Sequence, residues 1–204
     1  MKAPNSNIQA PEKLQTSNNG VPFFNTPDRI LRLNLAAAKW RGTPWRPNSS
    51  AAGVGVSCHN LPRALYIESQ FLPESFPKIE SLPATATAEN QMEAFLDGRP
   101  EFEPLQPFNA LTLQPGDLLG LFVPIDNVGK RIRNSCVNHL GVVLPEGWFI
   151  HTLMKKNTDV DLYSVSPWSQ IIKAVWRPVV SAECPTESGP VRLGQTKSNQ
   201  LTTE

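Results

Sequence analysis

The pattern of apolar residues changes at Asp117, and this change constrains the fold more than any other feature of the sequence. Before it, residues 27–40 and 57–69 carry apolar side chains at the spacing of a helix face. After it, short apolar runs separated by Pro, Gly and Asn are typical of strands: Leu118–Val123, Leu140–Leu144, Trp148–Leu153 and Ala174–Trp176. Helices followed by strands predict an α+β fold, with N-terminal helices packed on an antiparallel β-sheet.

The beginning of the first helix is marked by the Thr-Pro-Asp run at residues 26–28. Threonine suits the N-cap, proline suits the first helical position, and an acidic residue favours the positive end of a helix. Apolar residues then continue to Trp40, and the Gly-Thr-Pro run at 42–44 should end the helix.

The length of 204 residues fits one compact domain with two tails. Residues 1–21 and 181–204 are polar and lack apolar periodicity, which predicts disorder and leaves 22–180 as the folded domain. The Pro-rich connection 71–116 should hold one short helix near Ala88–Leu96. Its length predicts a lid or a binding loop.

Charge and composition narrow the function classes. The net charge is +1 with both signs interspersed, which predicts neither a nucleic-acid partner nor binding to an anionic membrane. The basic residues at 130–133 are expected to be a solvated loop. No apolar run approaches the ~18 residues of a membrane helix. No export signal is visible, so we expect a cytoplasmic protein, with non-classical export or a phage or secretion-system route as the alternative.

Cys58 is the first candidate for chemistry. It follows the small, Gly-containing stretch 45–56 and lies at the start of the second helix, which is predicted to open at Ser57 and to reach about Ser69. Helix N-terminal amides and the macrodipole would stabilise its thiolate and donate to a developing oxyanion. The alternative is a small buried apolar residue, as most free cysteines are. Cys58, Cys136 and Cys184 form an odd set that argues against a disulfide framework.

His139 and His151 lie on two adjacent predicted strands joined by the Pro-Glu-Gly loop 145–147. A three-residue loop of this type pairs Gly141 with His151 and places both histidines on one sheet face as diagonal neighbours. A two-residue loop would put them on opposite faces. Gly141 should leave open space beside His139.

Cys58 with two histidines supplies a nucleophile, a general base and a partner that orients the base. Two alternatives stay open. The histidines could be structural, or Cys136, His139, Cys58 and His59 could bind zinc. Zinc is disfavoured because Cys58 and His59 are adjacent on a helix, whereas zinc ligand pairs usually come from a tight turn. We therefore predict no metal and no cofactor.

Five segments, in order, resemble motifs of the NlpC/P60 family of cysteine peptidases and amidases. Residues 40–45 resemble its Gly-Thr-Pro-Tyr segment, 56–58 its Asp-Cys-Ser-Gly nucleophile motif, 113–118 its Leu-x-Pro-Gly-Asp-Leu turn, 138–143 its His-Val-Gly-Ile-Tyr strand, and 149–151 the strand that follows. The resemblance covers about residues 24–178.

The resemblance implies a papain-like α+β fold and cleavage of an amide or peptide bond through a thioester, typically in cell-wall peptides, so that the partner would be a peptidoglycan fragment. It implies Cys58 as nucleophile, His139 as general base and His151 as the residue that orients His139. The backbone N–H of Cys58 would be the oxyanion donor.

The sequence departs from the family at three places that bind substrate. Members that trim cell-wall peptides have Asp before the cysteine, Ser after it and Tyr upstream, and together these hold a free amino terminus. Ser57, His59 and Trp45 take those places here and are the predicted substrate-binding residues. Without the carboxylate an ammonium group loses its natural partner, so a different substrate is expected. A thioester-forming acyltransferase and a non-catalytic binding module are the alternatives.

Overall fold

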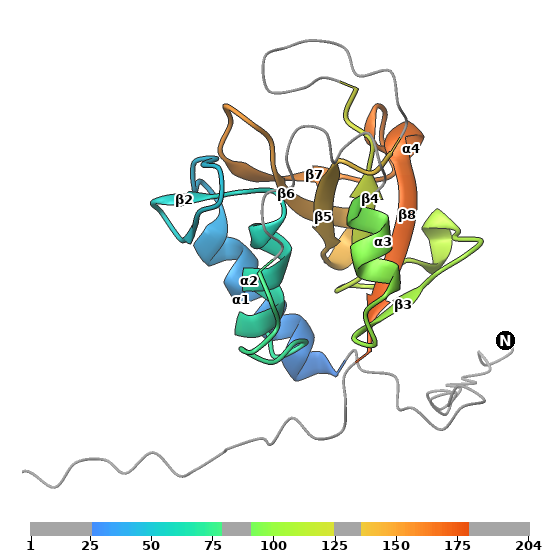
Figure 1. Ribbon diagram of the computed structural model, residues 1–204, viewed down its shortest axis with the longest axis horizontal. Coiled ribbons are helices and arrows are strands. Elements are labelled where there is room, and N and C mark those ends of the chain that lie inside the picture. The colour runs from blue at the N-terminus through green and yellow to red at the C-terminus, as the bar shows by residue number, and fades with distance from the viewer. Residues whose placement is uncertain (1–25, 79–90, 125–135, 180–204) are drawn as a thin grey trace, which may run out of the picture.

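The computed structural model of the protein describes residues 26–78, 91–124 and 136–179 (Figure 1). The predicted tails, Cys184 and the basic run at 130–133 lie outside the described residues.

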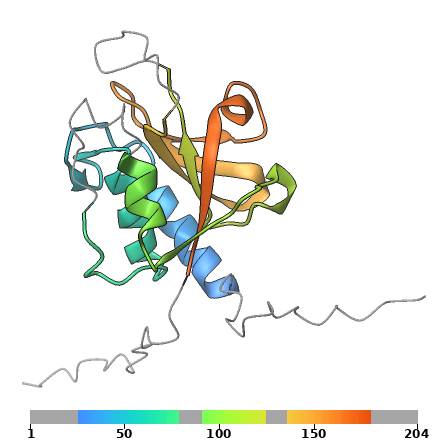
Figure 2. The ribbon, with the colours of Figure 1, turned by 45° about the vertical axis from the view of Figure 1, so that its right-hand side comes forward.

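Two helices, α1 (Pro27–Trp40) and α2 (Asn60–Glu68), pack against each other and against one face of the sheet (Figures 1 and 2). Helix α1 has the predicted bounds, and the side-chain oxygen of Thr26 accepts the Arg29 N–H at 3.4 Å. The local capping signals were therefore sufficient to position this helix.

The sheet has six strands in the order β3-β8-β4-β5-β6-β7, and each neighbouring pair is antiparallel. The strands are β3 (Phe102–Pro104), β4 (Leu118–Leu121), β5 (His139–Val143), β6 (Trp148–Thr152), β7 (Thr158–Leu162) and β8 (Ile172–Pro178). A separate hairpin pairs β1 (Ser50–Ala51) with β2 (Gly55–Val56). The predicted α+β class with an antiparallel sheet is confirmed, and β3 and β7 are additions to the four predicted strands.

The connection 71–116 contains more structure than the single predicted helix. It holds α3 (Gln91–Asp97), β3 and the 3₁₀ turn η2 (Ala110–Thr112). Strand β3 pairs with β8, so part of the predicted lid or binding loop belongs to the sheet.

Both faces of the sheet are covered. The helix side carries the larger core, which includes Leu33, Leu61, Leu65, Leu118, Leu140, Val142, Ile150 and Trp176. The other face carries a smaller cluster of Leu119, Leu121, Val143, Phe149 and Val175, covered by side chains such as Trp168 of the short helix α4 (Trp168–Ile171). Alternate residues of β5 and β6 thus point into different cores, as the period of a strand requires.

The β5–β6 hairpin has the predicted register. Gly141 pairs with His151 across the turn η3 (Pro145–Gly147), where Glu146 and Gly147 have φ of 61° and 82°. One detail was wrong, because the space over Gly141 is not open: a Cβ there would lie 2.6 Å from the ring of Phe149. The aromatic ring, and not a helix end, fills the place beside His139.

Candidate active site

The turn before α2 positions Cys58. The helix was predicted to open at Ser57, but its assigned start is Asn60. Ser57 caps this turn, because its Oγ accepts the Asn60 N–H at 3.3 Å and its carbonyl oxygen accepts the N–H groups of Asn60 and Leu61 at 3.1 and 3.0 Å. Cys58 and His59 therefore lie in the turn just before α2, where the first backbone N–H groups are not yet part of the helical hydrogen-bonding pattern.

The sulfur of Cys58 is subject to two opposing effects. Burial raises the pKa of its thiol from 9.0 to about 12, and hydrogen bonds from the backbone N–H groups of Cys58 and His59 lower that pKa by a smaller amount. The expected stabilisation by helix amides is present, but burial outweighs it. Together these effects favour the thiol over the thiolate in the free protein.

The two predicted histidines are in direct contact. His139 begins β5, His151 lies in β6, both are 3% exposed, and His139 Nε2 is 3.0 Å from His151 Nδ1. Burial lowers the pKa of His139 well below 6.5, and the neighbouring rings of His151 and His59 lower it further. His59, the residue after Cys58, is thus close enough to His139 for their charges to interact.

Asp161 was not among the predicted site residues. It lies on β7, and its Oδ2 is 2.9 Å from His151 Nε2. Burial lowers the pKa of His151, while the hydrogen bond and charge of Asp161 raise it. The alternation of Thr, Asp, Val, Asp and Leu at 158–162 was the available signal for this strand.

Two aromatic rings hold His151 in place. Phe149 stacks on its imidazole at 4.7 Å between ring centroids and 15° between planes. Trp168 meets it edge-on at 4.5 Å. These contacts fix the ring plane, so that its two nitrogens keep their partners, His139 and Asp161.

The three predicted substrate-binding residues lie around the start of α2. Trp45 forms a β-bridge with Val56, two residues before Cys58. Ser57 is buried and its hydroxyl is engaged in the cap. His59 has a buried Nδ1 without a hydrogen-bond partner. Their role towards a substrate stays a prediction.

The zinc alternative finds no support in the described residues. Within 26–78, 91–124 and 136–179, no three His, Cys, Asp or Glu side chains are grouped so that they could hold a metal ion. Cys58 and Cys136 are not in disulfides.

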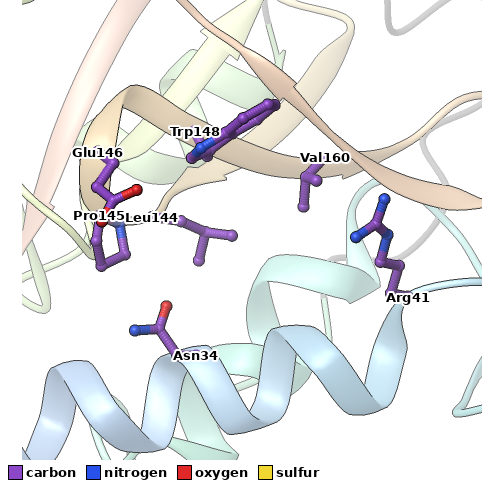
Figure 3. A pocket seen from close by; sticks show the side chains of 7 residues that line it. All are labelled: Asn34, Arg41, Leu144, Pro145, Glu146, Trp148 and Val160. Carbon is purple, nitrogen blue, oxygen red and sulfur yellow. The ribbon is translucent and has the colours of Figure 1, made fainter.

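A cavity of about 610 Å³ lies elsewhere, between α1 and the β5–β6 turn (Figure 3). It is lined by Asn34, Arg41, Leu144, Pro145, Glu146, Trp148 and Val160. Leu144 and Val160 belong to the helix-side core, whereas strand alternation puts His139 and His151 on the other face. The cavity is therefore separate from the histidine pair.

Comparison with known proteins identifies the fold. No protein-family model and no curated protein matches the sequence. Among solved structures, an NLP/P60-family protein similar to lipoprotein from Staphylococcus aureus subsp. aureus Mu50 superposes with a TM-score of 0.52 at 18% identity, over 80% of this chain and 45% of that one. The chain has the NlpC/P60 fold.

Two further structures with this fold name are more distant. They are an NlpC/P60 family protein from Bacillus cereus ATCC 10987 (TM-score 0.46, 14% identity, 82% of this chain and 44% of that one) and the NlpC/p60 domain of the peptidoglycan hydrolase SagA (TM-score 0.40, 16% identity, 72% and 96%). The chain spans less than half of the Staphylococcus and Bacillus proteins. The likeness to the Staphylococcus aureus structure establishes the NlpC/P60 fold.

In the described parts of the chain, no helix combines the length and the apolar character needed to cross a membrane.

Proposed function

We propose that the protein is a cysteine hydrolase that cleaves an amide or peptide bond through a thioester. Cys58 is the nucleophile, His139 is the general base and His151 orients His139. The observation that carries the proposal is the contact between His139 Nε2 and His151 Nδ1, because it commits one nitrogen of His139 and leaves Nδ1 to exchange a proton with a substrate or a thiol.

In the first half-reaction, the Cys58 sulfur attacks the carbonyl carbon while its proton moves to His139 Nδ1. The N–H groups of Cys58 and His59, which already lower the pKa of the thiol, would donate to the developing oxyanion. When the carbon–nitrogen bond breaks, His139 gives the proton to the leaving amine. A thioester and a free amine result.

In the second half-reaction, water attacks the thioester carbonyl and passes a proton to His139. The carbon–sulfur bond then breaks, the carboxylic acid leaves, and the proton returns to Cys58. The sum is amide plus water giving acid plus amine, and no other reactant is needed.

The high pKa of Cys58 and the low pKa of His139 favour a neutral thiol and a neutral imidazole over an ion pair. Proton transfer would then accompany attack on the bound substrate. Slow alkylation of Cys58 in the free protein is thus expected of this enzyme as well as of a binding module, so only turnover separates those two readings.

The substrate class is a peptide or amide, and cell-wall peptides are the first to test. No carboxylate precedes Cys58, where Ser57 uses its hydroxyl to cap the turn. This favours substrates that lack a free ammonium group at that position, such as internal amide bonds.

The test is turnover of purified peptidoglycan fragments and of a set of internal amide peptides, with products measured by mass spectrometry. Cys58→Ala should abolish turnover, and His139→Ala should lower it by about 10²–10⁴-fold. Cys136→Ala is the matched control and should keep wild-type turnover. Persistent turnover in Cys58→Ala would rule the proposal out.

Adding amine or hydroxyl acceptors to the same assay tests the acyltransferase alternative. A hydrolase gives the free acid whether or not an acceptor is present. Transfer of the acyl group to the acceptor as the main product would reassign the enzyme while keeping the roles of Cys58 and His139.

A further inference from the structure

Asp161, His151 and His139 form a continuous hydrogen-bonded chain across three strands. Asp161 Oδ2 is 2.9 Å from His151 Nε2, and His151 Nδ1 is 3.0 Å from His139 Nε2. The three groups come from β7, β6 and β5, which are neighbours in the sheet. We infer that Asp161 is a positioning residue that fixes the tautomers of both histidines and thereby places the basic lone pair of His139 on Nδ1. For its catalytic consequence this inference rests on the proposed function.

The position of each hydrogen follows from what each atom can donate or accept. An ionised carboxylate only accepts, so the hydrogen between Asp161 and His151 must be on His151 Nε2. A neutral imidazole carries one N–H, so His151 Nδ1 then holds a lone pair. That lone pair can only accept, and the hydrogen towards His139 must be on His139 Nε2. His139 Nδ1 is left as the unprotonated nitrogen.

Without Asp161, the two histidines could form the same hydrogen bond to each other with the donor and the acceptor exchanged. His151 could carry its hydrogen on Nδ1 and donate to His139 Nε2, which would then be the acceptor. In that arrangement the hydrogen of neutral His139 is on Nδ1, and this nitrogen can no longer accept a proton. The carboxylate of Asp161, at the far end of this series of hydrogen bonds, thus selects the form of His139 that can act as a base.

Both imidazoles must be neutral for this selection to matter. Burial lowers the pKa of each, and it does so strongly for His139. The groups that act on His151 from its surroundings are Asp161 and Asp159, which raise its pKa, and Lys156, which lowers it. Burial remains the largest effect, so the neutral pair prevails at neutral pH.

From the strand register alone, the expected partner of His151 would be Asp159 and not Asp161. Asp159 lies directly opposite His151, whereas Asp161 lies opposite Phe149. The carboxylate of Asp159 turns to Arg41 instead, with 3.0 Å between Oδ1 and the guanidinium Nε. Asp159 is therefore a matched control: it has the same charge, the same strand and similar exposure, with 64% for its side chain against 47% for Asp161.

The experiment reads the tautomers directly in the full chain. The protein has three histidines, so uniform ¹⁵N labelling and a long-range ¹H–¹⁵N correlation spectrum resolve each ring. In the wild type, His139 and His151 should both show the Nε2–H form. Asp161→Asn and Asp161→Leu should each give His139 a clear population with the hydrogen on Nδ1. Asp159→Asn should leave both rings as in the wild type.

Turnover supplies a second readout. Asp161→Asn should lower kcat by about 10- to 100-fold with KM nearly unchanged, as loss of a hydrogen-bond partner behind a reacting group does. Asp159→Asn should stay within about twofold.

The inference is overturned if His139 keeps the Nε2–H form in both Asp161 variants, whatever their activity. It is also overturned if the tautomers shift while kcat does not. Failure of the proposed function looks different: the tautomers respond to Asp161, but Cys58 supports no turnover on any amide. The half-exposed position of Asp161 makes folded variants the expected result, and the dispersion of the same spectra verifies it.

Discussion

Asp117 and Asp161 each bind a basic side chain on a neighbouring strand, but in different surroundings. The side chain of Asp117 is 1% exposed, and it accepts hydrogen bonds from Arg177 Nε at 2.8 Å, Arg177 Nη2 at 2.9 Å and the Gln114 N–H at 2.8 Å. The side chain of Asp161 is 47% exposed and binds His151. The carboxylate of Asp117 is buried and binds Arg177 through both of its oxygens, whereas the carboxylate of Asp161 is half-exposed to solvent.

This difference in exposure gives the two residues different roles. Asp117 stabilises the fold, whereas Asp161 determines which histidine nitrogens carry a hydrogen. A buried charge that loses its partner is costly, so Asp117 and Arg177 depend on each other and join the turn before β4 to β8. A half-exposed charge contributes little to stability because water screens it. Asp161 can still decide where a proton lies, because that choice depends on the direction of a hydrogen bond.

The largest expected effect on stability is that of Asp117→Asn. It removes the negative charge that binds Arg177, whose side chain is 22% exposed, and should lower the free energy of unfolding by about 3 kcal/mol. Urea unfolding followed by circular dichroism measures this. The double variant Asp117→Leu/Arg177→Leu should recover part of the loss, since it removes both charges. A single variant as stable as the wild type would show that the pair does not hold the fold.

Acid should weaken the histidine region. Burial lowers the pKa of His59 from 6.5 to about 4. Between those values the unfolded chain binds a proton that the folded chain does not, so stability is lost as pH falls from 6.5 towards 4. For His59 the loss is at most about 3 kcal/mol.

The measurement is urea unfolding of wild type and His59→Gln at pH 7.5 and pH 4.5. The wild type should lose more stability than the variant between the two values. An equal loss in both proteins would mean that His59 does not titrate in this window, and that the acid response comes from other groups.

Structural features of the protein differ in how far the sequence predicted them. The Thr26 cap and the three-residue loop at 145–147 are local signals, and the helix start and the hairpin register that they predict are both confirmed. The turn containing Asp117 was visible only through its resemblance to a motif of the NlpC/P60 family. Features set by neighbouring residues could be derived without a structure.

Asp161 could not be reached in the same way. Its role depends on β7 pairing with β6 and on Asp159 turning to Arg41, a residue more than a hundred positions away in the chain. The burial that raises the pKa of Cys58 likewise comes from packing, which a helix-start pattern does not reveal. The sequence thus predicted the contact between the two histidines but not the carboxylate that binds His151 or the burial of the thiol.

Gly141→Ala tests whether the ring packing beside His151 matters. The new Cβ would lie 2.6 Å from the ring of Phe149, which stacks on His151, so the ring must shift. We expect a loss of about 1–3 kcal/mol in unfolding free energy. Gly98→Ala is the control, because its Cβ would meet nothing closer than 3.4 Å. Equal stability of the two variants would show that the stack tolerates displacement.

The smallest expected effect on stability is that of Asp161→Asn. With a half-exposed side chain, this variant should change the free energy of unfolding by less than about 1 kcal/mol, as should Asp159→Asn. The same urea experiment used for Asp117→Asn measures it. A loss as large as that of Asp117→Asn would make Asp161 a structural carboxylate, and any fall in activity would then report unfolding. A small loss together with a large fall in kcat would instead assign the effect to the proton that Asp161 orders.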